Sequence, residues 1–283
     1  MLVEQLDYNL LFRWFVGLSM DEEIWNHSVY SKNRDRILNT EFAILFLRSI
    51  RDQAENAGLL SSDHFTVDGT LIESWASLKS FRPKDEGSQP PSSCGRNPEV
   101  DFHGEKRCND THVSTSDPES RLFKKGKGKE AKLCFMGHVL MENRNGLAVD
   151  TRVTQATGKA EREAALAMAE AVTCRRRRIT VGADKGYDCK SFVTGLRAVK
   201  ATPHVAQRAK GSAIDGRTTR HAGYLISQKT RKRVEEIFGW IKDVAWLRKS
   251  RYKGAERIGC LFTFAAATYN MVRMRSLGIG VSG

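Results

Sequence analysis

The sequence predicts an α/β protein in which helices pack on a mixed β-sheet. Three observations lead to this expectation. Strand-type and helix-type segments alternate between residues 63 and 207, helical patterns flank them on both sides, and hydrophobic residues make up 40% of the 283-residue chain. This length and apolar content suffice for a buried core.

The N-terminal half is expected to contain helices followed by strands. Residues 1–60 have helical periodicity, with an apolar stripe at Leu2, Leu6, Leu10, Leu11 and Trp14 and a second helix over 41–56 that Gly58 ends. Alternation predicts a strand over 63–68. Two apolar runs predict strands over 133–142 and 146–155, and the Asn-Gly pair before the second favours a tight hairpin.

The C-terminal half continues the alternation and ends in helices. The pattern predicts a helix over 161–172, a strand over 179–184, a helix over 190–199, a strand over 203–207, and helices over 229–243 and 256–275. Residues 80–130 interrupt this order. They hold five of the six prolines and show little periodicity, so a long loop insertion is expected there.

Charge is distributed unevenly along the chain. The formal net charge is +13, and residues 205–283 hold 16 Lys and Arg against 5 Asp and Glu. Nucleic acid explains this asymmetry better than an ordinary solvated basic face does. The N-terminus has no signal-peptide layout and no apolar run is long enough to span a membrane. A cytoplasmic protein without a membrane partner is therefore expected.

Acidic residues follow two of the expected strands and occupy one expected helix. Asp68 leaves the strand over 63–68, Asp184 ends the strand over 179–184, and Glu235 lies in the basic helix over 229–243. Carboxylates placed in this way can converge on a pair of Mg²⁺ ions, as in enzymes that cut and join phosphodiester bonds.

Both aspartates also have a structural interpretation. Asp68-Gly69 is a common hairpin-turn pair, although the residues after it suggest an irregular or helical continuation. Asp184 is explained equally well as a turn residue, with Gly186 allowing a positive φ. Asp188 lies close by and competes with Asp184 for the functional role.

Glu235 is expected to share one helix face with two cations. Arg231 stands four residues before it and Lys242 seven after it, while Val234, Ile237, Phe238 and Ile241 would bury the opposite face. The structural alternative is a surface ion pair worth roughly 0.3 kcal/mol. The functional interpretation is a metal carboxylate flanked by phosphate-binding cations. Glu236 points elsewhere on the helix and is the weaker candidate.

Together these residues resemble the DDE transposases of bacterial insertion sequences, in the branch whose signature is Arg, three residues, Glu, six residues and Lys. Arg231, Glu235 and Lys242 match that spacing, and Asp68 and Asp184 match the preceding acids at intervals of 116 and 51 residues. Gln228 stands where this branch often has a Tyr. Residues 19–37, 99–112, 125–147 and 269–274 are also similar, so the resemblance covers nearly the whole chain.

The resemblance implies a ribonuclease-H-like fold, with a mixed five-stranded sheet flanked by helices. Residues 1–60 would be an N-terminal helical segment, 61–255 the catalytic domain with its loop insertion at about 80–130, and 256–283 a C-terminal helix packing on that domain. It further implies that Asp68, Asp184 and Glu235 hold two Mg²⁺ ions, for which Mn²⁺ can substitute. A set of oxygen ligands without a His/Cys cage argues against zinc.

The implied function is cleavage of double-stranded DNA at insertion-sequence ends and strand transfer into target DNA, by a homodimer in the bacterial cytoplasm. Arg231, Lys242, Lys185 and Arg233 would bind the DNA. Family members usually carry helical sequence before the part that matches residues 2–36, so an N-terminally truncated copy with impaired transposition is expected. Two alternatives remain, namely a metal-dependent nuclease that does not join strands and a non-catalytic DNA-binding remnant.

Overall fold

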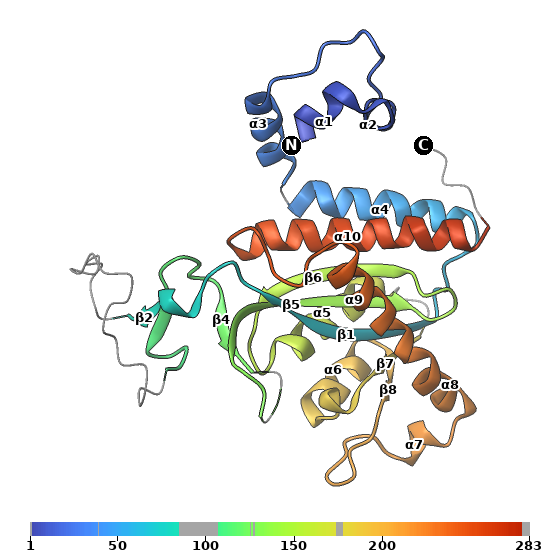
Figure 1. Ribbon diagram of the computed structural model, residues 1–283. Helices are drawn as coiled ribbons and strands as arrows, with labels where there is room; N and C mark the ends of the chain where they lie inside the picture. The colour runs from blue at the N-terminus through green and yellow to red at the C-terminus, as the bar shows by residue number, and fades with distance from the viewer. Residues whose placement is uncertain are drawn as a thin grey trace.

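Helices pack on both faces of a central sheet in the computed structural model, which describes residues 2–38, 40–84, 107–124, 126, 128–173 and 178–278 (Figure 1). The helices are α1 (Leu2–Tyr8), α2 (Leu10–Val16), α3 (His27–Ile37), α4 (Thr40–Asn56), α5 (Ala160–Val172), α6 (Lys190–Ala198), α7 (Gly216–Thr219), α8 (Ala222–Thr230), α9 (Val234–Asp243) and α10 (Ala255–Ser276). The strands are β1 (His64–Glu73), β2 (Phe81–Pro83), β3 (His112–Ser114), β4 (Arg121–Phe123), β5 (Lys132–Glu142), β6 (Ala148–Gln155), β7 (Ile179–Ala183) and β8 (Ala201–Val205). Short 3₁₀ helices are η1 (Leu78–Ser80), η2 (Lys185–Tyr187) and η3 (Arg231–Arg233).

Five strands of the main sheet follow the order β6-β5-β1-β7-β8. β5 is antiparallel to β1 and to β6, whereas β1, β7 and β8 are parallel. A sheet in which only the second strand runs backwards is the ribonuclease-H-like arrangement, so the expected α/β fold is confirmed. Among the described residues the sheet gains a sixth strand, because β4 pairs with the start of β5.

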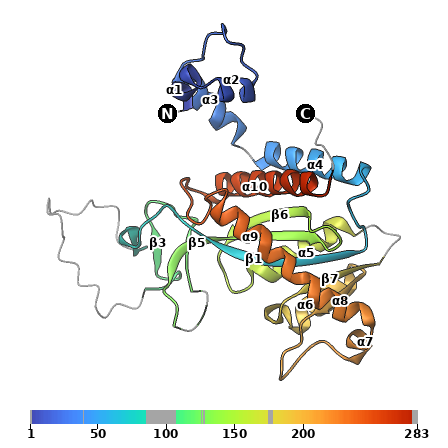
Figure 2. The same cartoon turned by 45° about the vertical axis from the view of Figure 1, so that its right-hand side comes forward.

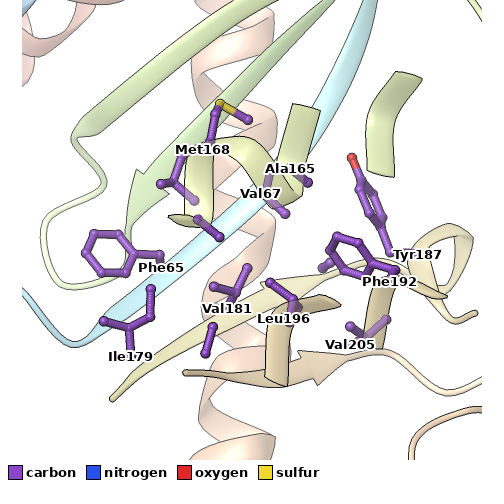
Figure 3. Close-up of a cluster of buried hydrophobic side chains, with 14 of the residues drawn as sticks. Phe65, Val67, Ala165, Met168, Ile179, Val181, Tyr187, Phe192, Leu196 and Val205 are labelled. Atoms are coloured by element: carbon purple, nitrogen blue, oxygen red, sulfur yellow. The ribbon is translucent and has the colours of Figure 1, made fainter. Parts of the chain in front are cut away.

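The two faces of the sheet are covered by different helices. Residues alternate across β1, so Phe65 and Val67 enter a core with α5 and α6 (Figure 3). Ile72 enters the core on the other face, with α9 and α10. Phe262 of α10 packs so closely on β5 that a Cβ added to Gly137 would lie 2.6 Å from its ring.

The long helices α4 and α10 come from opposite ends of the chain and lie side by side (Figures 1 and 2). Leu47 and Ile50 of α4 share a core with Ala267 and Met274 of α10. α10 is also tied to β6, because the Asn270 side chain donates to the Ala148 carbonyl and accepts its N–H, both at 2.8 Å. The described residues contain no helix with the length and apolar character needed to cross a membrane.

Helices α1–α3 lie beyond this helix pair, away from the sheet (Figure 1). The apolar stripe predicted from Leu2 to Trp14 does not form one buried helix face. Leu6 is buried, but Leu10, Leu11 and Trp14 are 59%, 64% and 75% exposed. Asn9 breaks the helix, because its side chain accepts the N–H groups that begin α2.

Part of the expected loop over 80–130 forms strands. β2 pairs with β3, and β4 joins the main sheet. Residues 85–106 of that loop lie outside the described residues. The last strand lies two residues earlier than expected, at Ala201–Val205, because its register is set by pairing with β7 rather than by its own pattern.

Candidate functional site

Asp68 lies in the middle of β1 rather than at its end. The strand continues through Gly69 to Glu73 and pairs with β5 along this whole length. Gly69 has no positive φ. The expected exit from the strand at the Asp-Gly pair is therefore wrong, because hydrogen bonds to β5 hold both residues in the sheet.

β7 brings Asp184 beside Asp68. The parallel register aligns Thr66 with Gly182, and two further residues along each chain align the two aspartates. β7 ends at Ala183, so β1 loses its parallel neighbour close to Asp68. There the Gly69 N–H is bound by Asp68 itself, with Oδ1 at 2.8 Å. The two acids thus flank the point where the strands part.

The turn after β7 fixes Asp184. Its Oδ1 accepts the Gly186 N–H at 2.6 Å. Gly186 does not have the positive φ of the turn interpretation, and a Cβ there would lie 2.8 Å from Asp184 Oδ1. Space, rather than backbone conformation, requires this glycine. The competing Asp188 is buried and accepts the N–H groups of Arg208 and Ala213, both at 2.8 Å, which gives it a structural role.

Negative charge is crowded around Asp68. Burial is the main cause that raises the pKa of Asp68 to about 7, and the charges of Asp184 and Glu161 raise it further. The Gly69 N–H and the Arg231 guanidinium act in the opposite direction. A carboxyl group that is half protonated near neutral pH, beside other acids, can exchange its proton for a divalent cation.

The helix expected over 229–243 is broken into α8, η3 and α9. The 3₁₀ turn at η3 advances about 120° per residue instead of about 100°, so the helix is not regular between Arg231 and Glu235. Arg231 Cβ lies 3.8 Å from where a Cβ on Gly182 would be. Its Nε donates to Gln228 Oε1 at 3.1 Å. Arg231 therefore lies over Gly182 of β7, and Gly182 stands two residues before Asp184.

The buried face of α9 agrees with the prediction. Its apolar residues Val234, Ile237, Phe238 and Ile241 pack in the core that also contains Ile72 of β1. Glu235 and Glu236 are both exposed in the first turn. Packing of α9 on the sheet therefore sets the position of Glu235.

The other expected DNA-binding residues lie in different surroundings. Arg233 donates from Nη1 to the Asn143 carbonyl at 2.9 Å, which ties it to the turn between β5 and β6. Lys185 is exposed in η2, directly after Asp184. Lys242 lines a cavity of about 370 Å³ whose other lining residues include Glu73, Lys132 and Arg248.

A polar group on the far face of β1 was missing from the sequence predictions. A Cβ on Gly69 would lie 3.0 Å from Glu161 Oε1 and 3.3 Å from His138 Nδ1. The Tyr187 hydroxyl points away from the apolar side chains around it (Figure 3). Burial first, and then the charges of Asp68, Glu161 and Asp184, raise the pKa of Tyr187. Glu161 gave only the signal of an acid in a first helical turn, which is common.

Two of the expected three metal ligands are brought together. Asp68 and Asp184 offer carboxylate oxygens, which suit Mg²⁺ or Mn²⁺. Their crowded charge also fits a cation. Within the described part of the chain, however, no group of three or more His, Cys, Asp or Glu side chains is arranged to hold a metal ion. Glu235 is not gathered with the two aspartates.

Comparisons with known proteins point to one class. A family model described as Transposase DDE domain matches residues 109–271, which include Asp184 and Glu235 but begin after Asp68. A second model, described as a transposase domain, matches residues 1–36. No curated protein sequence matches this chain significantly.

Solved structures that match this chain include two transposase complexes. A piggyBac transposase synaptic complex with hairpin DNA is 12% identical, with a TM-score of 0.38, over 78% of this chain and 49% of that chain. A Mos1 transposase paired-end complex with the left transposon end is 10% identical, with a TM-score of 0.25, over 97% of this chain and 75% of that chain. The match thus spans about half the length of the first of these proteins.

Proposed function

The chain belongs to the Transposase DDE domain family, and we propose that it cuts DNA at the ends of an insertion sequence and joins the freed strands to target DNA. One observation carries the proposal. Asp68 and Asp184 each stand two residues beyond the paired Thr66 and Gly182 of β1 and β7, and, after burial, the Asp184 charge raises the pKa of Asp68. Neighbouring carboxylates at this place, in a domain of this family, support phosphodiester chemistry.

Asp68, Asp184 and Glu235 are the proposed ligands of two divalent cations, Mg²⁺ or Mn²⁺. When bound, such ions make a water or a 3′-hydroxyl group a stronger nucleophile and stabilise the leaving oxygen. Asp68 and Asp184 present their oxygens from adjacent strands. Glu235 approaches from the start of α9, so its participation requires this helix end to draw nearer to the strands.

The DNA backbone is the proposed partner of Arg231, Lys242, Lys185 and Arg233. The 16 Lys and Arg against 5 Asp and Glu in residues 205–283 support this assignment. Arg231 is close enough to Asp68 for its charge to lower the pKa of that carboxyl group, against burial, which raises it. It is therefore suited to hold a phosphate near the acids. Two copies of the chain would pair two DNA ends.

Substitution of Asp184 tests the proposed chemistry. Asp184→Asn keeps an oxygen that can accept the Gly186 N–H, so the fold and the DNA affinity should be retained while Mg²⁺-dependent nicking of supercoiled plasmid DNA is lost. Asp52→Asn, in the exposed part of α4, is the matched control and should nick like the wild type. Nicking by Asp184→Asn at the wild-type rate would refute the assignment.

A strand-transfer assay separates transposition from simple nuclease activity. An oligonucleotide with a free 3′-hydroxyl group and a target plasmid are supplied together, and joined products are measured. Joining that depends on Asp184 supports the transposase. Nicking without any joining would support a metal-dependent nuclease, and salt-dependent DNA binding without nicking in Mn²⁺ would support a binding remnant.

A further inference from the structure

A carboxylate from helix α5 reaches the backbone next to Asp68 from behind the sheet. Glu161 lies in the first turn of α5, which packs on the face of β1 opposite to α9. A Cβ on Gly69 would lie 3.0 Å from Glu161 Oε1 and 3.1 Å from its Cγ. The Glu161 side chain thus occupies the space that a side chain at position 69 would need.

This contact explains why glycine follows Asp68. Gly69 is in an ordinary strand conformation and makes no turn. Its missing side chain is needed because real Cβ atoms rarely approach other atoms as closely as 3.0 Å. Asp68 and Gly69 therefore serve two faces of one strand, with Asp68 beside Asp184 and Gly69 against Glu161.

Two buried polar side chains point toward the same region. His138 and Tyr187 are each only 1% exposed. Among the described residues, His138 Nδ1 and the Tyr187 hydroxyl have no hydrogen-bond partner. A Cβ on Gly69 would lie 3.3 Å from His138 Nδ1 as well as 3.0 Å from Glu161 Oε1. Because nearly all buried polar atoms in proteins have a partner, two such atoms here call for an explanation, such as a charged neighbour or a bound ion.

His138 is suited to hold the Glu161 carboxylate. Burial lowers its pKa to about 4, so the ring is neutral near pH 7. Its Nε2 is 2.8 Å from Thr154 Oγ1. With the threonine hydroxyl donating to Nε2, the ring proton lies on Nδ1, the nitrogen on the Glu161 side. A hydrogen bond from Nδ1 to the Glu161 carboxylate would satisfy this unpartnered nitrogen.

An acid in the first turn of a helix often does no more than complement the helix dipole. Glu163 provides the comparison, because it stands in the same first turn of α5 and is exposed. Its charge is not among those that act on Asp68, whereas that of Glu161 is. The helix end alone therefore does not account for the placement of Glu161.

We propose that Glu161 is a positioning residue of the cleavage site. Its charge, held against Gly69 beside His138 and Tyr187, strengthens the affinity of Asp68 and Asp184 for a divalent cation without touching the reacting atoms. This inference rests on the proposed function, since it assumes that the two aspartates bind the cation.

The experiment measures Mn²⁺ binding to the DNA-free protein by calorimetry, together with nicking as a function of Mg²⁺ concentration. Glu161→Gln keeps the size of the side chain and removes its charge. It should weaken Mn²⁺ binding by about tenfold, as loss of an outer-sphere partner does. It should raise the Mg²⁺ concentration for half-maximal nicking by a similar factor, with little change in the rate at saturating Mg²⁺. Glu163→Gln should match the wild type in both measurements.

Equal Mn²⁺ affinity of Glu161→Gln and Glu163→Gln would overturn the inference. If Glu161→Gln fails to fold, Gly69→Ala decides instead. Its added methyl group displaces the Glu161 carboxylate and should also weaken Mn²⁺ binding, and unchanged binding would overturn the inference. Asp184→Asn reports on the proposed function separately. Wild-type Mn²⁺ affinity in that variant would show that the aspartates hold no cation, whatever Glu161 does.

Discussion

The strand edge with Asp68 and Asp184 and the helix end with Glu235 are positioned by different forces. Backbone hydrogen bonds fix the register of β1 against β5 and β7, and a slip of one residue would turn every side chain to the wrong face. Apolar contacts of Val234, Ile237 and Phe238 hold α9 on the sheet. Such contacts are not directional, so the packing of α9 gives Glu235 no hydrogen-bonded register of the kind that aligns the two aspartates.

This difference explains which acids are brought together. The two aspartates are set beside each other by the sheet itself. Glu235 depends on where α9 settles, and no three-membered ligand group forms among the described residues. In the proposed function, the sheet would supply the preformed half of the site, and α9 would supply the acid that DNA or a cation draws in.

The sharpest test of this division is the loss of Glu235. Glu235→Gln should slow Mg²⁺-dependent nicking by roughly 1000-fold, about 4 kcal/mol in the barrier, if the helix end completes the site. Glu236→Gln, the next residue of the same turn, should nick almost like the wild type. Rates would be measured on supercoiled plasmid. Equal rates for the two variants would show that Glu235 takes no part in cleavage and that Asp68 and Asp184 act without it.

Weakening the contact between α9 and the sheet should be the next largest effect. Ile241 is fully buried, and Ile241→Ala should lower the free energy of unfolding by about 3 kcal/mol through lost burial and a cavity. Ile226 of α8 is 62% exposed, and Ile226→Ala should change it by about 0.5 kcal/mol or less. Urea denaturation measures both. A similar cost for the two variants would contradict the assigned packing.

The sheet acids should show a pH dependence of their own. Because burial above all raises the pKa of Asp68 to about 7, a cation must displace a proton below that pH. Mn²⁺ affinity should therefore rise by about tenfold from pH 5.5 to pH 6.5 and level off above pH 7. Calorimetry at a series of pH values measures this. Asp68→Asn should lose the dependence, and a flat wild-type profile would contradict the raised pKa.

The same pKa shift predicts how stability changes without a cation. The pKa of folded Asp68 lies above its unfolded value of 3.8, chiefly through burial. Its contribution to stability is therefore fully present below about pH 4 and is lost as the pH rises toward 7. Without a cation, the thermal unfolding midpoint of the wild type should therefore fall relative to that of Asp68→Asn as the pH rises from about 4 to about 7. Added Mn²⁺ should raise the wild-type midpoint most at pH 7 and above.

The smallest effects are expected from the cations along the α9 region. Arg231→Gln and Lys242→Gln should each reduce the slope of log affinity for DNA against log salt by about 1. Arg48→Gln, on the exposed side of α4, should leave the slope unchanged. Fluorescence anisotropy with a labelled duplex at several salt concentrations measures this. If Lys242→Gln alone left the slope unchanged, Lys242 would make no phosphate contact. The DNA would then pass near Arg231, before the start of α9, and not near its end.

Local patterns were enough to predict much of the fold. An apolar run placed the strand over 133–142, observed as Lys132–Glu142, and a helical pattern placed the helix over 161–172, observed as Ala160–Val172. It also identified the buried residues of α9. The helices were predictable because their apolar residues recur on one face in step with the backbone, and the strand because it is a continuous apolar run that is buried on both faces of the sheet.

The parts that could not be predicted depend on distant residues. Gly69 resembled a turn residue because its true reason, the approach of Glu161, comes from 92 positions later in the chain. Arg231 was placed on a regular helix because nothing in its neighbours announces the 3₁₀ turn of η3. The short strands within 80–130 exist only through pairing with other segments. In each case a contact made by folding overrides the local pattern.

The place of α10 at the end of the chain affects how the protein is made. The sheet face that carries Phe135 and Val139 is covered by α9 and by α10, which begins at Ala255. A ribosome working from the N-terminus has therefore finished every strand before this cover emerges. The nascent chain exposes an apolar sheet face until translation is nearly complete, a state in which chains aggregate or require chaperones. A reading frame that stops before codon 255 is expected to yield insoluble product rather than a partly active enzyme.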